Sequence, residues 1–269
     1  MNRNSNVYTV IYATVLTVLV AILLTVAALG LAPQQKANSD NEKKQQILSS
    51  ISSVLGKEVT FENAAEIWNE LDMDNNMSVV NTKGEELDGV NAFEIVTKQQ
   101  FKAGVVKDDA QLPIFIAKVN GKNYYIMAMY GAGLWDAVWG YLSVESDGST
   151  IAGASFDHAS ETAGLGAKIK DDPAFAAAFI GKHLFQGEEF APVQVLKQGK
   201  TAANGADQVD AITGATKTSD CVSTIINNSM TGYKETLKMI AFLNGVGEAE
   251  AADSTSCESD QNVEPVNAE

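Results

Sequence analysis

Leu112-Pro-Ile-Phe-Ile-Ala-Lys-Val119 and Tyr124-Tyr-Ile-Met-Ala-Met-Tyr130 flank the dipeptide Asn120-Gly121. Both runs are rich in aromatic and β-branched residues, which fit the pleated surface of a strand. Asn-Gly between two such runs is typical of a tight hairpin turn, because both residues tolerate the left-handed backbone that the turn requires. We therefore expect an antiparallel pair of strands over these two segments.

Other runs predict further elements around this hairpin. We expect strands over Ser78–Asn81, Phe93–Thr97, Ala137–Val144, Thr150–Phe156, Val193–Leu196 and Gly205–Ile212. We expect helices over residues 41–56, Phe61–Leu71, Asp172–Phe185 and Thr218–Leu243, the last followed by the stop signal Asn244-Gly245. Because strands and helices do not alternate strictly, the sequence predicts an α+β domain with a mixed or antiparallel sheet and flanking helices.

The N-terminal part of the chain predicts one membrane-spanning helix. Residues Val7 to Ala32 contain no charged side chain, and as a helix they would extend about 39 Å, enough to cross a hydrocarbon core of about 30 Å with some tilt. A cleaved signal peptide is the competing interpretation, but its apolar region typically has only about 7–15 residues. We expect an uncleaved anchor over 7–32, after a short segment 1–6 and before a domain over 33–247.

Composition excludes several classes of function. The net charge of −15 argues against nucleic-acid binding, because no basic stripe is available for phosphates. Only Cys221 and Cys257 are present, without a CxxC pair, and only two His. This argues against an iron–sulfur cluster, a c-type haem or a metal site, and favours two free thiols. Acidic residues without Lys or Arg predict a disordered tail over 248–269.

The segment Asp210-Ala211-Ile212-Thr213-Gly214-Ala215-Thr216 has the composition of an anion-binding loop. Gly214 and Ala215 remove side-chain bulk, so another molecule can approach the backbone closely. Thr216 supplies a hydroxyl where the last expected helix begins, and a helix N-terminus favours a phosphate through its unpaired N–H groups and its dipole. The alternative is an ordinary turn in which Thr216 and Thr218 act as helix caps.

Four landmarks carry a resemblance to a known family. The segment 210–216 matches Asp-x-x-[Ser/Thr]-Gly-Ala-Thr, which resembles the site where FMN transferases attach FMN to threonine. Glu161-Thr162-Ala163-Gly164-Leu165-Gly166 looks like the Glu-Thr-Pro-Gly-Leu-Gly segment of FMN-binding domains, with Ala163 replacing Pro. The N-terminal stretch Asn4–Thr14, and Gly131–Trp135 followed by Gly140, look like the C subunit of the sodium-translocating NADH:quinone reductase.

The resemblance implies a flavoprotein of an electron-transport complex. FAD:protein FMN transferase would join one FMN to Thr216 as a phosphoester, with Asp210 and Thr213 shaping the loop that it recognises together with Gly214 and Ala215. The FMN would lie beside residues 161–166, where Glu161, Thr162, Gly164, Leu165 and Gly166 are the expected contacts. Other membrane subunits of the complex would oxidise NADH, reduce ubiquinone and move sodium, while this chain relays electrons.

Three points remain open on the sequence alone. Lys36, Lys43 and Lys44 follow the expected span and favour a cytoplasmic domain, whereas the resemblance implies an inner-membrane protein with a periplasmic domain, which we adopt. The related G subunit of the ferredoxin-linked Rnf complex and a non-redox assembly protein are alternative functions. Trp135 and Trp139 are expected on one face as core residues, and His158 either contacts the cofactor or is structural.

Overall fold

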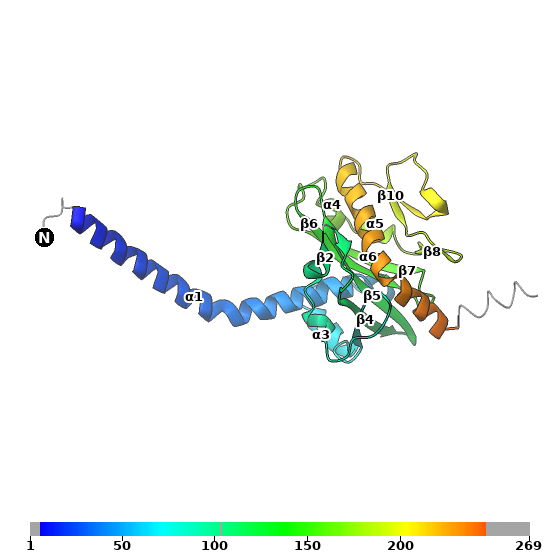
Figure 1. Ribbon diagram of the computed structural model, residues 1–269, viewed down its shortest axis with the longest axis horizontal. Helices are drawn as coiled ribbons and strands as arrows, with labels where there is room; N and C mark the ends of the chain where they lie inside the picture. The colour runs from blue at the N-terminus through cyan, green and yellow to red at the C-terminus, as the bar shows by residue number, and fades with distance from the viewer. Residues whose placement is uncertain (1–5, 103, 246–269) are drawn as a thin grey trace, which may run out of the picture. The chain divides into compact units, whose positions relative to one another are not determined.

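The N-terminal helix is much longer than a membrane span requires. The computed structural model describes residues 6–102 and 104–245, and within them α1 runs over Asn6–Ser49. This helix is long and apolar enough to cross a membrane. The hydroxyls of Thr14, Thr17 and Thr25 donate to backbone carbonyls one turn earlier, which satisfies these polar groups inside the helix. Pro33 lies within α1 and cannot donate its share of the helical hydrogen bonds, which explains the bend in Figure 1.

The chain divides into two compact units, Met1–Lys44 and Gln45–Glu269. The helix predicted over 41–56 is confirmed for most of its length, but it is divided: α1 continues to Ser49 and a short α2 follows at Ser52–Leu55. Gly56 then ends α2 with φ at 64°, a left-handed conformation that suits glycine. The acidic tail and Cys257 lie outside the described residues, while Cys221 is a free thiol on the last helix.

Five antiparallel strands form the central sheet, in the order β1-β4-β5-β6-β7. Their bounds are Met77–Val80, Leu112–Val119, Lys122–Ala132, Ala137–Val144 and Ile151–His158. The hairpin predicted at Asn120-Gly121 is confirmed: Val119 pairs with Lys122, and both turn residues have positive φ. The predicted α+β class with an antiparallel sheet is therefore confirmed.

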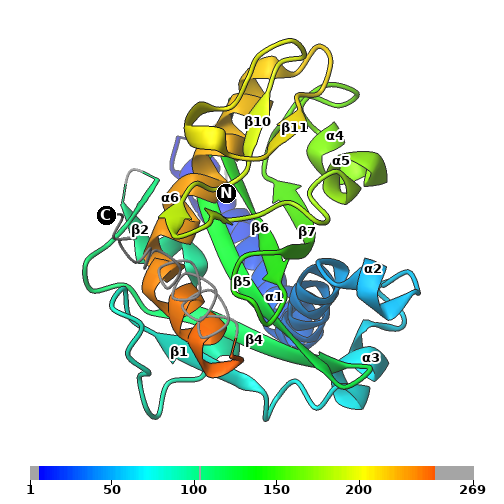
Figure 2. The same ribbon diagram turned by 90° about the vertical axis from the view of Figure 1, so that its right-hand side faces the viewer.

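Apolar side chains are buried on both faces of this sheet, because alternate residues of a strand point to opposite sides. In β5, Met127 and Met129 pack with the long helix α6, Thr216–Leu243, and with α5, Pro173–Ala177. Ile126 and Ala128 pack on the other side with the end of α1 and with α3, Ala64–Glu70. Figures 1 and 2 show α6, in orange, along one face of the sheet.

Tyr233 fixes α6 to the sheet. Its phenol is fully buried, donates to the Pro113 carbonyl at 2.9 Å and accepts from the Ala128 N–H at 3.3 Å. One side chain thus ties α6 to both strands of the hairpin and holds the helix against the sheet.

Short elements complete the second unit. They are η1 Ala92–Glu94, η2 Thr97–Gln100, β2 Phe101–Lys102, β3 Val105–Val106, α4 Lys168–Asp171, β8 Phe185–Gln186, β9 Glu189–Phe190, β10 Gln194–Leu196, η3 Ala203–Gly205 and β11 Gln208–Asp210. Strands β10 and β11 pair in parallel, and β2–β3 and β8–β9 are antiparallel pairs.

Two local predictions are wrong for identifiable reasons. The strand expected over Phe93–Thr97 is replaced by 3₁₀ turns, because the Asn91 side chain accepts from the Phe93 N–H and starts η1. The helix expected over Asp172–Phe185 ends at Ala177. Pro173 does occupy its first turn, but the chain then bends so that His183 bridges to Thr150.

Candidate functional site

Three loops that are far apart in the sequence meet at the N-terminus of α6. They are the β5–β6 turn, the segment after β7 that begins at Glu161, and the loop between β11 and α6. Together they line a hollow of about 260 Å³, which we call the loop pocket. Its lining consists of Leu134, Glu161, Thr162, Leu165, Gly166 and residues 214–218. The two sequence motifs at 161–166 and 210–216 therefore share one site.

The Glu161 carboxylate joins the β5–β6 turn and the segment after β7 to the first turn of α6. Its side chain is buried, with 7% of its surface exposed. Oε1 accepts hydrogen bonds from the backbone N–H of Leu134 at 2.8 Å and of Trp135 at 3.2 Å, while Oε2 accepts from the Thr218 hydroxyl at 2.7 Å. Hydrogen bonds to a charged acceptor are stronger than neutral ones, so this residue holds the walls of the loop pocket together.

Two glycines leave the space that this carboxylate occupies. A Cβ atom on Gly133 would lie 2.6 Å from Glu161 Oε1, and one on Gly166 would lie 2.5 Å from Glu161 Oε2. Carbon and oxygen do not approach so closely, so any larger residue at either position would displace the carboxylate. Gly133 and Gly166 therefore both border the buried carboxylate, although the Asp136 carbonyl oxygen at Gly133 and the Thr218 hydroxyl at Gly166 also lie 2.7 Å from where a Cβ would be.

Thr216 is the first residue of α6 and lines the loop pocket, half-buried. No side chain of the described residues caps this helix N-terminus, and its first turn contains no acidic residue. Lys217, which is exposed, follows Thr216. Unpaired N–H groups, the helix dipole and a lysine together favour an anion beside the Thr216 hydroxyl.

Gly214 and Ala215 bring the loop into this position. Gly214 has φ at 84°, which glycine adopts without strain. A Cβ atom on Gly214 would lie 3.0 Å from the Leu165 side chain. Ser219 holds the loop from beneath, because its hydroxyl accepts from the Ile212 N–H and donates to the Ala215 carbonyl. The sequence did not predict this role of Ser219.

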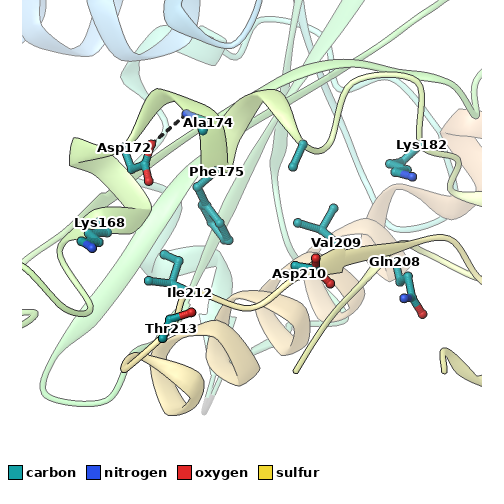
Figure 3. Close-up of a pocket in the computed structure, with 11 residues that line it drawn as sticks. Lys168, Asp172, Ala174, Phe175, Lys182, Gln208, Val209, Asp210, Ile212 and Thr213 are labelled. Carbon is teal, nitrogen blue, oxygen red and sulfur yellow. Dashed lines mark hydrogen bonds between the residues drawn. The ribbon is translucent and has the colours of Figure 1, made fainter. Parts of the chain in front are cut away.

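Asp210 and Thr213 lie outside the loop pocket. They line a separate hollow of about 690 Å³, the side groove, between the β11–α6 loop and helices α4 and α5. Figure 3 shows both side chains at this groove, with Lys168 toward one end and Lys182 toward the other. Gly164 is exposed, with φ at 72°, and is not among the residues that line the loop pocket. The motif residues therefore face two different surfaces.

Trp135 corrects the expectation that both tryptophans are core residues on one face. It lies in the β5–β6 turn, 69% exposed, and its indole N–H donates to the Thr162 hydroxyl at 3.1 Å. Trp139 lies half-buried in β6 and donates to Gln46. His158 is structural in part, because its Nδ1 accepts from the Glu161 N–H at 3.2 Å.

An apolar rim surrounds the loop pocket. The side chains of Leu134, Trp135 and Leu165 are 49%, 69% and 44% exposed. A second hollow of about 480 Å³ adjoins the same turn and is lined by Gly133, Trp135 and Asp136 among others. Exposed apolar side chains next to an anion-favouring helix N-terminus suit a ligand that has a phosphate at one end and a flat apolar ring at the other.

Comparison with known proteins agrees with this arrangement. Residues 133–231 match the profile of a family described as FMN-binding domain, which includes all three loops. The C subunit of the Na(+)-translocating NADH-quinone reductase from Vibrio vulnificus is 30% identical over 219 residues, covering 77% of this chain and 84% of the relative. The chain belongs to the family of C subunits of the Na(+)-translocating NADH-quinone reductase.

Solved structures of this family share the fold. The crystal structure of the C subunit from Parabacteroides distasonis has 42% sequence identity and a TM-score of 0.69, covering 77% of this chain and 96% of that one. Shewanella oneidensis NqrC is 21% identical, with a TM-score of 0.60 over 76% of this chain and 98% of that one, and supports the fold alone. The resemblance found in the sequence is thereby confirmed.

Proposed function

We propose that this protein relays electrons in a sodium-translocating NADH:quinone reductase through one FMN esterified to Thr216. The observation that carries the proposal is the convergence of the 161–166 and 210–216 segments at the uncapped N-terminus of α6. When bound, FMN supplies a ring that accepts and releases electrons. The protein's own residues bind, orient and enclose that ring.

The loop pocket fits one part of FMN and leaves another part at the surface. Its volume of about 260 Å³ is smaller than that of a pocket that encloses a whole ligand, about 300–1,000 Å³. The hydroxyl of Thr216 and the first N–H groups of α6 would hold the phosphate, while Leu134, Trp135 and Leu165 offer apolar contacts for the ring. A partly exposed ring suits an electron carrier, because its partners must approach it closely.

Each of the remaining site residues has a proposed task. Thr162 lies at the rim, where its hydroxyl accepts from the Trp135 indole and orients that side chain. Gly166, Gly214 and Ala215 keep the pocket open, since their backbones line it without side-chain bulk beyond one methyl group. Gly164 supplies the left-handed turn of the 161–166 loop.

The position of Asp210 and Thr213 supports maturation by a separate enzyme. Both belong to the motif, yet both face the side groove instead of the loop pocket. We propose that the FAD:protein FMN transferase reads these two side chains while Thr216 receives the phosphoryl group. Formation of the phosphoester releases AMP from FAD, and the threonine hydroxyl loses its proton.

The N-terminal helix gives the proposed location. We assign residues 7–32 to the inner membrane and 33–247 to a periplasmic domain, with the short segment 1–6 and the tail 248–269 at its ends. The span contains no Asp, Glu, Lys, Arg or His, so we assign sodium transfer to the other subunits. We assign NADH oxidation to them as well. Its partners are those membrane subunits.

The decisive experiment measures covalent flavin in the full chain made with FMN transferase. Wild type and Thr216→Ala are compared by intact mass and by flavin fluorescence after denaturation. We expect a mass increase matching one FMN in wild type and none in Thr216→Ala. Unmodified wild-type protein would refute the proposal and favour a non-redox assembly role for the same domain.

A further inference from the structure

The Glu161 carboxylate is the most deeply buried charge at the site. Besides holding the loops together, it brings an uncancelled negative charge to the loop pocket. Of the acidic groups that line the loop pocket, it is the only one within the described residues, and no cation of those residues forms an ion pair with it. Its three partners, two backbone N–H groups and one hydroxyl, are neutral donors. Its negative charge is therefore stabilised but not cancelled.

We propose that Glu161 sets the reduction potential of the flavin as well as the shape of the pocket. This inference rests on the proposed function, because it requires FMN at Thr216. Glu161 is a positioning residue, since its oxygens are occupied by protein donors, and its charge acts on the ring through space.

The sign of the effect follows from electrostatics. An upstream one-electron carrier is oxidised as the flavin is reduced, and the same electron then leaves for a downstream carrier, so no atom is transferred. An added electron would place negative charge on a ring at the rim of a pocket whose wall already holds a carboxylate, and repulsion would raise the free energy of the reduced form. Glu161 therefore lowers the flavin's reduction potential.

Because the Glu161 carboxylate is buried, its electrostatic effect extends further than that of an exposed charge. Solvent screens exposed charges strongly, whereas a charge with 7% of its residue surface exposed is screened much less. Its field extends along α6: burial raises the pKa of the Cys221 thiol, and the negative charge of Glu161 raises it further, ahead of the neighbouring Asp220. The Thr216 side of the loop pocket, lined by Glu161 itself, is exposed to the same field.

Two features of the site oppose the negative charge of Glu161, namely the Lys217 ammonium group and the positive end of the α6 dipole. Lys217 is exposed, so water screens its positive charge. The α6 dipole favours negative charge at the phosphate end of the ligand and falls off within the first turn. Asp136, in the same turn as Leu134 and Trp135, is exposed and provides a natural comparison for the buried carboxylate.

The test uses Glu161→Gln in the full chain, loaded by FMN transferase and titrated spectroelectrochemically beside wild type. Glutamine keeps an oxygen for the Leu134 and Trp135 N–H groups, and its NH₂ can donate to the Thr218 hydroxyl. Geometry is therefore retained while the charge is removed. We expect an upward shift of the midpoint potential, with flavin still bound covalently.

Asp136→Asn is the matched control, because it removes an exposed charge from the same turn and should shift the potential less. A loaded Glu161→Gln protein with the wild-type potential would overturn the inference. If Glu161→Gln does not load, Thr218→Val takes its place: loss of a donor leaves the carboxylate less compensated, so the potential should fall, and an unchanged potential overturns the inference.

Two further outcomes have distinct meanings. Failure of both variants to load, beside a loaded wild type, would overturn the electrostatic role and leave Glu161 with a purely structural one. Wild-type protein without covalent flavin would instead refute the proposed function, which keeps the two failures apart.

Discussion

Replacing Gly153 by Ala should destabilise the domain where α1 meets the sheet. Gly153 lies in β7, and a Cβ atom there would be 2.3 Å from the backbone carbonyl oxygen of Ser50. Ordinary contact begins at 3.4 Å, so the two backbones must separate by about 1 Å. The neighbouring residues Ile47, Leu48 and Ile51 are fully buried, which leaves little freedom for that movement.

The separation also removes a hydrogen bond. Ser143 Oγ donates to the Ser50 carbonyl at 2.7 Å, and an increase of about 1 Å takes this pair beyond hydrogen-bonding distance. An unsatisfied buried group costs about 1–3 kcal/mol and overpacking about 1–3 kcal/mol, so the free energy of unfolding should fall by about 2–6 kcal/mol. For a domain of this size, that lowers the melting temperature by roughly 4 °C or more.

Tryptophan fluorescence during thermal unfolding of the full chain in detergent provides the assay. All three tryptophans lie beyond α1, so the signal reports the domain and not the membrane helix. Ser143→Ala is the control, because it removes the hydrogen bond without adding an atom and should cost less than Gly153→Ala. A Gly153→Ala protein that melts within about 1 °C of wild type would refute the close approach on which the reasoning rests.

Two further predictions concern the site and the core. Gly214→Ala places a side chain at a φ of 84°, which costs about 1–2 kcal/mol. The rate of covalent flavin loading by the transferase should therefore fall by roughly 5–30-fold. A wild-type rate would contradict the required loop geometry. Burial raises the pKa of the Tyr141 and Tyr233 phenols in the folded state. Since the unfolded phenols ionise near pH 10 and the folded ones stay neutral, the free energy of unfolding should fall above about pH 10. Urea titrations on either side of that pH should show a smaller fall for Tyr141→Phe, and equal falls would rule out this linkage.

The hairpin and the long helix after the 210–216 loop could be predicted because their signals are local. Asn120-Gly121 forms a turn through its own backbone preference. The place of Thr216 at a helix N-terminus follows from the helical pattern of the residues just after it. The bounds of β4 and β6 also agree with the predicted strands. In each case neighbouring residues in the sequence supply the deciding interactions.

Other features could not be predicted because they depend on contacts between distant residues. Glu161 meets donors 27 and 57 residues away along the chain, and no periodicity marks such partners. Trp135 was expected in the core because of its size, whereas its place in a turn leaves it exposed. Asp210 shares a motif with Thr216 but faces another surface, since β11 directs its side chain away from the loop pocket.

The glycines around Glu161 have a consequence for how this family can change over evolutionary time. A Cβ atom on Gly133 would lie 2.7 Å from the Asp136 carbonyl oxygen as well as close to Glu161, and one on Gly166 would lie 2.7 Å from the Thr218 hydroxyl oxygen. A lineage that loses the carboxylate therefore still has the backbone of the turn against position 133, whereas at position 166 the neighbouring group is the Thr218 side chain, which can itself be replaced. Glycine should therefore persist at position 133 whatever residue occupies position 161, whereas positions 161, 166 and 218 should vary together, as a single inherited unit spread over distant parts of the sequence.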